Sequence, residues 1–356
     1  MITLLATVFV LGVLVFIHEL GHFLTAKLSK IRVERFSLGY PPRLIGKKIG
    51  DTDYCLSAIP FGGYVKISGM VDESLDKKQL ESEPKPWEFR SKPWGNKFLV
   101  VLAGSVMNLI FAFMIFVASA WIQGIADVKG PWIGEVIEGK PAALAGLKSK
   151  DRIFEVNGES IRTWDRLTEI VHSSSDKPLS FKWTRGDTIH SASIIPVKDK
   201  IIDHGDIREV GLIGILPDYE IKKIGFFQAI RHGGTNFYYL SKLVVVSVYR
   251  LITGKESVKS LAGPVFIAKL AGDSAKSGIW VLFEFMALLS LNLGILNLLP
   301  FPVLDGGHIL MLSIEGIIRR EIPIKAKMII QQAGMALLIG LMVLAVYNDI
   351  LRIFKH

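Results

Sequence analysis

Cysteine is almost absent from this chain, since Cys55 is the only one among 356 residues. A single thiol excludes an intrachain disulfide and excludes a metal site built from several thiolates. A small fold held together by disulfides is therefore excluded too. We expect Cys55 to be a small buried residue.

The N-terminal apolar stretch lacks the two marks of a cleaved secretion signal. It has no basic region before the apolar residues and no small-residue cleavage motif after them. We therefore expect the stretch to remain in the protein as a membrane anchor.

Acidic residues are the scarcer charged class, with 33 Asp and Glu against 42 Lys and Arg, which gives a formal net charge of +9. A basic excess can indicate nucleic-acid binding, but here the basic residues are spread along the chain. The cluster after the first apolar stretch instead resembles a positive-inside signal at a membrane surface. We expect the lipid bilayer, and no nucleic acid, as a partner. The cluster consists of Lys27, Lys30, Arg32 and Arg35.

Apolar residues make up 50% of the chain, and the mean hydropathy is +0.40. These values are too high for an ordinary soluble protein and too low for a bundle of membrane helices alone. Four segments contain apolar runs long enough to cross a bilayer. They are residues 1–28, 98–122, 279–308 and 328–348.

Three further regions lie between these segments. Residues 29–97 contain short alternating runs broken by proline and glycine, which predict a small membrane-associated β-structure and a linker. Residues 220–278 carry apolar side chains at helical spacing, which is typical of amphipathic helices. Residues 127–198 form an inserted module. The predicted fold class is a polytopic α-helical membrane protein with four transmembrane helices and an inserted α+β domain.

The inserted module has a recognisable order of elements. A strand, a short helix and a tight turn are followed by a strand with an Asn157-Gly158 hairpin signal, a helix around Trp164–Val171 and further strands. This order resembles bacterial PDZ domains, which bind an extended peptide or a C-terminus by adding it to a sheet edge. The alternative is a module that only blocks access to an active site.

Basic residues also predict the orientation. The loop from Lys27 to Lys97 holds 14 Lys and Arg against 9 Asp and Glu, and the short loop before the last span is basic as well. Both loops should be cytoplasmic, which places both termini and the PDZ-like module outside the plasma membrane. His18 then lies roughly 24 Å along its helix from the outer end, in the cytoplasmic half of the membrane.

The first span carries the run His18-Glu19-Leu20-Gly21-His22. Two histidines four residues apart lie on one face of a helix and can bind one metal ion. The glutamate beside them is placed to take a proton from the attacking water. A chance match usually lies on a solvated helix, whereas this one lies in an apolar span where polar groups are costly.

The third span ends in a stretch that includes Pro300, Pro302 and Asp305. The prolines remove backbone donors and should break the helix, and such irregular backbone persists in a membrane only where protein or a watery cavity satisfies it. Asp305 should lie at a depth comparable with His18 and His22. Two imidazoles and a carboxylate leave one position open, as in a catalytic zinc site.

Three asparagines in the spans are candidate contacts for the attacking water or for the backbone of a substrate. Contact between helices is an equally good explanation for each of them. They are Asn108, Asn292 and Asn297.

HELGH in the first span, the stretch Ile59–Ile67, the PDZ-like module and the Asn297–His308 stretch together resemble the bacterial site-2 proteases. This resemblance implies an intramembrane metalloprotease with Zn²⁺ on His18, His22 and Asp305 and with Glu19 as general base. It also implies a β-structure around Phe61–Val65 that extends the substrate, with Gly62, Gly63 and Tyr64 as substrate-binding residues.

The implied substrates are single-span membrane proteins, such as trimmed anti-sigma factors or signal-peptide remnants. Two features depart from the family pattern: there is room for only one PDZ-like module, and Ser105 stands where a proline often follows the glycine of the second span. A membrane metal transporter and an inactive PDZ scaffold remain as alternative functions.

Overall fold

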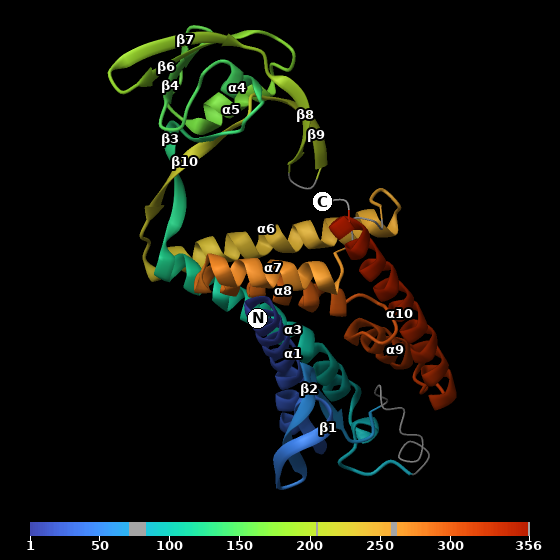
Figure 1. Cartoon of the computed structure of the whole chain (residues 1–356). Coiled ribbons are helices and arrows are strands. Elements are labelled where there is room, and N and C mark those ends of the chain that lie inside the picture. Colours follow the sequence, from blue (N-terminus) through green and yellow to red (C-terminus); the bar gives the residue numbers. More distant parts are fainter. Residues whose placement is uncertain (71–82, 204–205, 258–261, 355–356) are drawn as a thin grey trace. The chain divides into compact units, whose positions relative to one another are not determined.

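The computed structural model describes residues 1–70, 83–203, 206–257 and 262–354. Part of the linker expected within 29–97 thus lies outside the described residues. The chain forms two units (Figure 1). One unit comprises residues 1–118 and 232–356, and the other comprises residues 119–231.

Four helices of the described chain are long and apolar enough to cross a membrane, as predicted. At a rise of about 1.5 Å per residue, even the shortest, with 19 residues, approaches the thickness of a bilayer core. The four are α1 (Ile2–Leu28), α3 (Trp94–Gln123), α8 (Ile279–Asn297) and α10 (Ile324–Phe354).

The predicted third span is divided into two helices. α8 ends at Asn297, and α9 (Asp305–Ile318) begins after a loop that contains both prolines. The loop folds back tightly on the start of α9, because a Cβ at Gly306 or Gly307 would collide with carbonyl oxygens of Leu299 and Phe301. Asp305 therefore occupies the first turn of a new helix.

A small antiparallel β-structure packs on α1. It consists of two long strands, β1 (Val33–Ile49) and β2 (Thr52–Ile67). Phe36 of β1 pairs with both Tyr54 and Val65 of β2, so the first half of β1 lies between the two halves of β2. The Phe36 ring lies 4.8 Å from the Phe23 ring and 5.7 Å from the Phe16 ring of α1, measured between centroids. This contact fixes the β-structure beside the first span.

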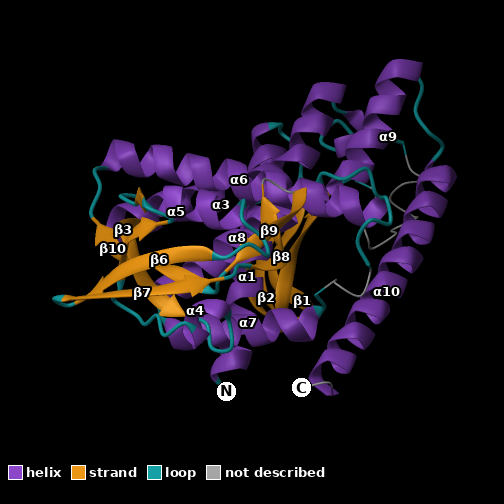
Figure 2. Ribbon diagram, turned by 90° about the horizontal axis from the view of Figure 1, so that it is seen from above, coloured by secondary structure: helices purple, strands orange, loops and turns teal. Residues whose placement is uncertain are grey.

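The second unit contains the predicted α+β module, and its sheet continues beyond residue 198. β10 (Ile215–Lys222) returns to pair with β3 (Figure 2). The strand order is therefore β10-β3-β4-β6-β7. A separate hairpin consists of β8 (Val197–Asp203) and β9 (Asp206–Leu212). The remaining elements are β3 (Ile125–Val136), α4 (Pro141–Leu144), β4 (Arg152–Val156), β5 (Glu159–Ser160), α5 (Trp164–His172), β6 (Leu179–Arg185) and β7 (Thr188–Ile194).

The helices expected within 220–278 are α6 (Phe226–Ile252) and α7 (Pro264–Ser277), and a 3-10 turn, η1 (Phe89–Ser91), precedes α3. Asp349 of α10 caps the start of α7, since its carboxylate accepts from the Gly263 and Phe266 N–H groups at 2.9 Å each. Cys55 is buried and free, as expected.

Phe181→Ala should lower the free energy of unfolding of the second unit by about 3–5 kcal/mol, because the ring is fully buried in its core. Ile189→Ala on the adjacent strand should cost less than about 0.5 kcal/mol, since Ile189 is 69% exposed. Limited proteolysis of the full chain across a urea series measures both. Equal losses in the two variants would contradict this core assignment.

Candidate metal centre

His18 and His22 lie one turn apart on α1, and both are buried. Their Nε2 atoms are 3.1 Å apart. The helix therefore directs both Nε2 atoms to the same point, and the four-residue spacing predicted this common face.

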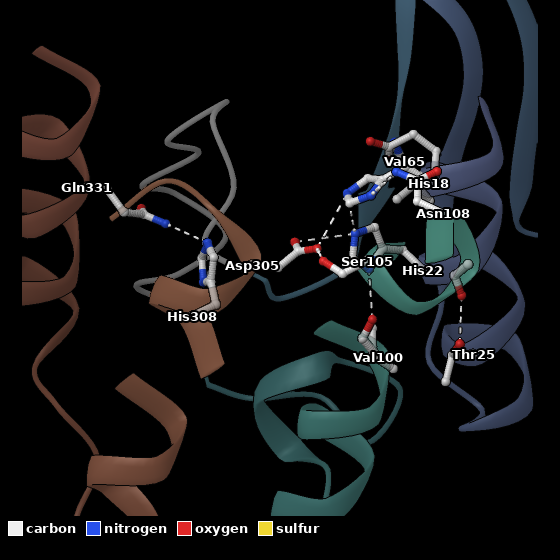
Figure 3. Close-up of polar contacts among 12 residues, drawn as sticks. His18, His22, Thr25, Val65, Val100, Ser105, Asn108, Asp305, His308 and Gln331 are labelled. Atoms are coloured by element: carbon white, nitrogen blue, oxygen red, sulfur yellow. Dashed lines mark hydrogen bonds and ion pairs between the residues drawn. The ribbon is translucent and has the colours of Figure 1, made fainter. Parts of the chain in front are cut away.

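Asp305 brings a carboxylate to these nitrogens from α9. Its Oδ2 lies 3.5 Å from His18 Nε2, and its Oδ1 lies 3.4 Å from His22 Nε2. Figure 3 shows the three side chains pointing toward one another. The ligand atoms of these three residues all lie within 4.8 Å of one another.

The separations between these atoms fit a zinc ion. Tetrahedral bonds of about 2.0–2.1 Å place neighbouring ligand atoms about 3.3–3.4 Å apart. The two histidine nitrogens lie 3.1 Å apart, and each lies 3.4 or 3.5 Å from a different oxygen of Asp305, so each of these distances is close to that value. With one oxygen of Asp305 as its ligand atom, the three ligand atoms lie within 4.8 Å of one another. Two imidazoles and one carboxylate are also a donor set that zinc uses in catalytic sites.

Two glycines let α1 and α3 approach closely at this point. A Cβ at Gly21 would collide with the Ala103 carbonyl, and a Cβ at Gly104 would collide with the His18 and His22 rings. Gly21 of HELGH is therefore a packing position as well as part of a motif.

Glu19 lies on the same helix and contacts the β-structure. Its Oε2 accepts a hydrogen bond of 2.9 Å from the Val65 N–H of β2. Sequence reasoning missed Val65 as a contact of Glu19, because this donor is a backbone group and leaves no trace in the residue type.

α3 contacts the second ring nitrogen of His22 and the carboxylate of Asp305. His22 Nδ1 lies 2.8 Å from the Val100 carbonyl oxygen, and Ser105 Oγ donates to Asp305 Oδ2 at 2.9 Å. The sequence marked Ser105 only as a departure from a family pattern. Its partner is 200 residues away, so no local spacing could have revealed the bond.

The three asparagines have different surroundings. Asn108 is fully buried, and its Nδ2 lies 3.3 Å from His18 Nδ1. Asn292 Nδ2 donates to the Leu288 carbonyl of its own helix at 3.0 Å, and Asn297 is the half-buried last residue of α8.

The three candidate substrate-binding residues of β2 lie directly before Val65. Gly62 faces Val15 of α1, Gly63 lies against the Ser37 carbonyl, and the Tyr64 hydroxyl accepts from Arg35 Nη1 at 2.9 Å. Their strand thus runs past the helix that carries the two histidines. His308 lies away from the ligand set and contacts Gln331 of α10 (Figure 3).

Comparisons with known proteins show the family to which the chain belongs. The model of the family described as Peptidase family M50 matches residues 6–341. The chain belongs to this family. It is a zinc metalloprotease of the intramembrane site-2 protease type.

Its M50 relatives are matched over nearly their full length. A protein of Clostridium perfringens, provisionally named a zinc metalloprotease, is 35% identical, with 95% of each chain covered. The zinc metalloprotease RasP of Geobacillus kaustophilus is 28% identical, with 99% of this chain and 98% of that protein covered. The regulator of sigma-W protease RasP of Bacillus subtilis is 28% identical, with 99% of each covered.

Among solved structures, PDZ domains of SdrC-like proteins align with part of the chain. The domain from Listeria monocytogenes is 23% identical, covers 26% of this chain and 90% of its own, and has a TM-score of 0.21. The domain from Listeria innocua is 27% identical, covers 26% and 97%, and has a TM-score of 0.22. The α+β character of the module follows from its own strands and helices.

Gly104→Ala should weaken zinc binding by at least about tenfold, because the added methyl group would displace the two imidazole rings. Gly95→Ala is the matched control on the same helix, since a Cβ there meets no atom of the described chain within 4 Å. Competition with a chromophoric chelator measures both affinities. Equal affinity in Gly104→Ala and Gly95→Ala would show that the close approach is not needed.

Proposed function

We propose that His18, His22 and Asp305 hold the catalytic zinc of this M50 protease and that Glu19 is its general base. The observation that carries the proposal is the convergence of the three ligand atoms within 4.8 Å, next to Glu19 on the same helix. These groups come from two chain segments that are far apart in the sequence, and they meet among apolar helices.

The reaction is hydrolysis of a peptide bond within or beside a transmembrane segment. Held by His18, His22 and Asp305, zinc would supply Lewis-acid polarisation of the scissile carbonyl and of the attacking water. The Glu19 carboxylate accepts a proton from this water and later delivers it to the leaving amine. The hydrogen bond from Val65 N–H limits the orientations open to this carboxylate.

The outer edge of β2 is the proposed place where the substrate is extended. A helical substrate hides its amides in internal hydrogen bonds, so it must unwind before cleavage. Val65 directs its N–H at Glu19 and away from β1, so this strand edge faces the proposed base. An unwound segment that pairs with Gly62, Gly63 and Tyr64 would lie next to the metal ligands.

The proposed substrates are single-span membrane proteins such as trimmed anti-sigma factors or signal-peptide remnants. The name of the Bacillus subtilis relative, a regulator of sigma-W protease, supports this class. In the module, the sheet ends at β10 and β7. We propose that this module binds an extended peptide or a C-terminus, with steric control of access as the alternative.

The proposed orientation places the termini and the module outside the plasma membrane. The 14 basic residues between Lys27 and Lys97 support a cytoplasmic location for that loop. The metal ligands then lie in the cytoplasmic half of the bilayer.

The two alternative functions have less support. A metal transporter needs a series of ligand groups across the membrane, whereas the described residues contain one three-ligand cluster. An inactive scaffold would not need Glu19, which the chain keeps beside the ligands.

Glu19→Gln should leave zinc binding intact and reduce cleavage of a model single-span substrate by about 10²–10⁴-fold, because the amide cannot take the proton. The glutamine oxygen can still accept from Val65 N–H, so the local fold should be kept. Zinc content and cleavage of the purified protein measure the two properties separately.

A matched control is chelator treatment of the unmodified protein, which should abolish cleavage until zinc is restored. Cleavage by Glu19→Gln at the unmodified rate would remove Glu19 from the mechanism. Metal flux through vesicles without cleavage would favour the transporter.

The orientation can be tested by thiol labelling in a Cys55→Ser background. Asp187→Cys, in the exposed β6–β7 turn, should react with a membrane-impermeant maleimide in intact spheroplasts. Asp51→Cys, in the β1–β2 turn, should react only after lysis. The reverse pattern would invert the proposed topology.

A further inference from the structure

α3 makes a polar contact with every proposed metal ligand. The Val100 carbonyl contacts His22 and the Ser105 hydroxyl contacts Asp305. The third contact joins the Asn108 amide to His18 Nδ1. Figure 3 shows Ser105 and Asn108 beside the ligand set.

With the Asn108 amide in its present orientation, the third contact would pair two hydrogen-bond donors once His18 binds zinc. His18 Nε2 is the atom that faces Asp305 and His22 Nε2. A neutral imidazole that coordinates through Nε2 carries its proton on Nδ1. Nδ1–H would then have another donor, Asn108 Nδ2, at 3.3 Å. The His18 ring also forms a hydrogen bond with the Gly104 backbone of α3, which does not remove this pairing of two donors.

We propose that Asn108 is a positioning residue for His18, with its amide turned so that Oδ1 accepts the hydrogen bond from Nδ1–H. This inference rests on the zinc site proposed above. The oxygen and nitrogen of an amide occupy nearly equivalent positions, so the turn needs no change in packing. Asn108 Oδ1 is buried and has no hydrogen-bond partner among the described residues, so the turn gives up no bond of that oxygen.

The surroundings of Asn108 favour action through His18 over contact with a substrate. Its side chain has no solvent exposure, so neither water nor a substrate backbone reaches it in this arrangement. Its own backbone is fixed to α8, because Ser290 Oγ donates to the Asn108 carbonyl at 2.9 Å. A histidine ligand whose outer nitrogen is held in this way keeps its tautomer and ring orientation.

The charge and shape of the side chain at position 108 can be varied separately. Asn108→Asp keeps the shape and an acceptor oxygen, whereas Asn108→Leu keeps a similar volume and removes the acceptor. In the full-length protein in nanodiscs, zinc affinity should be about 10–100-fold weaker in Asn108→Leu and near the unmodified value in Asn108→Asp. Competition with a chromophoric chelator gives these affinities.

Cobalt substitution gives a second readout, the visible spectrum, in which a change of ligand orientation can be distinguished from a general loss of packing. The visible spectrum of the Co²⁺ protein should change in Asn108→Leu and be restored in Asn108→Asp, since it reports ligand orientation. Ser119→Ala removes a buried polar group elsewhere on α3 and should leave the zinc affinity and the cobalt spectrum unchanged. Asn108→Ala replaces the leucine variant, with the same expected result, if the latter does not accumulate.

The outcomes separate this inference from the proposed function. If the unmodified protein binds no stoichiometric zinc, the proposed site fails. If it binds zinc and the leucine or alanine variant binds equally well with an unchanged cobalt spectrum, the role of Asn108 is overturned. A loss in Asn108→Asp as large as that in Asn108→Leu would also overturn it, because the amide would then act as a donor.

Discussion

The close approach of α1 to α3 at Gly21 and Gly104 is the contact on which the proposed metal centre depends. Without a side chain at either position, the Ala103 backbone and the two imidazole rings occupy the space between the helices. This small separation brings α3 within hydrogen-bond distance of His22 and His18. Small residues at membrane helix contacts commonly allow such approach, because lipid supplies no hydrophobic force to press helices together.

The break between α8 and α9 allows Asp305 to reach the two histidines. A continuous helix would carry Asp305 about 12 Å beyond Asn297 along one axis, given a rise of about 1.5 Å per residue. The chain instead folds back after the prolines, and Gly306 and Gly307 admit carbonyl groups of the returning loop. Asp305 then meets both histidines. The irregular backbone is tolerated in an apolar region because it is packed against protein.

The four spans and the common face of His18 and His22 could be predicted from sequence because each leaves a local signal. The four-residue spacing of His18 and His22 fixes their common face, and long apolar runs fix the helices. The contacts of Ser105 and Val65 could not be predicted, because one joins residues 200 positions apart and the other uses a backbone donor. The pairing of β10 with β3 could not be predicted either, since strand pairing across 79 to 97 residues is set by tertiary packing.

The three proposed ligands all receive further polar contacts from one helix, and this has a physical reason. A buried polar atom without a partner is costly in an apolar region, so the second nitrogen of each imidazole and the carboxylate all need partners. Val100, Ser105 and Asn108 lie within three turns of α3, so the helix fixes the distances between these partners. A single rigid element can therefore hold ligands from α1 and α9 in one mutual arrangement. The same contacts from α3 thus satisfy the hydrogen-bonding groups of the proposed ligands and fix their orientation.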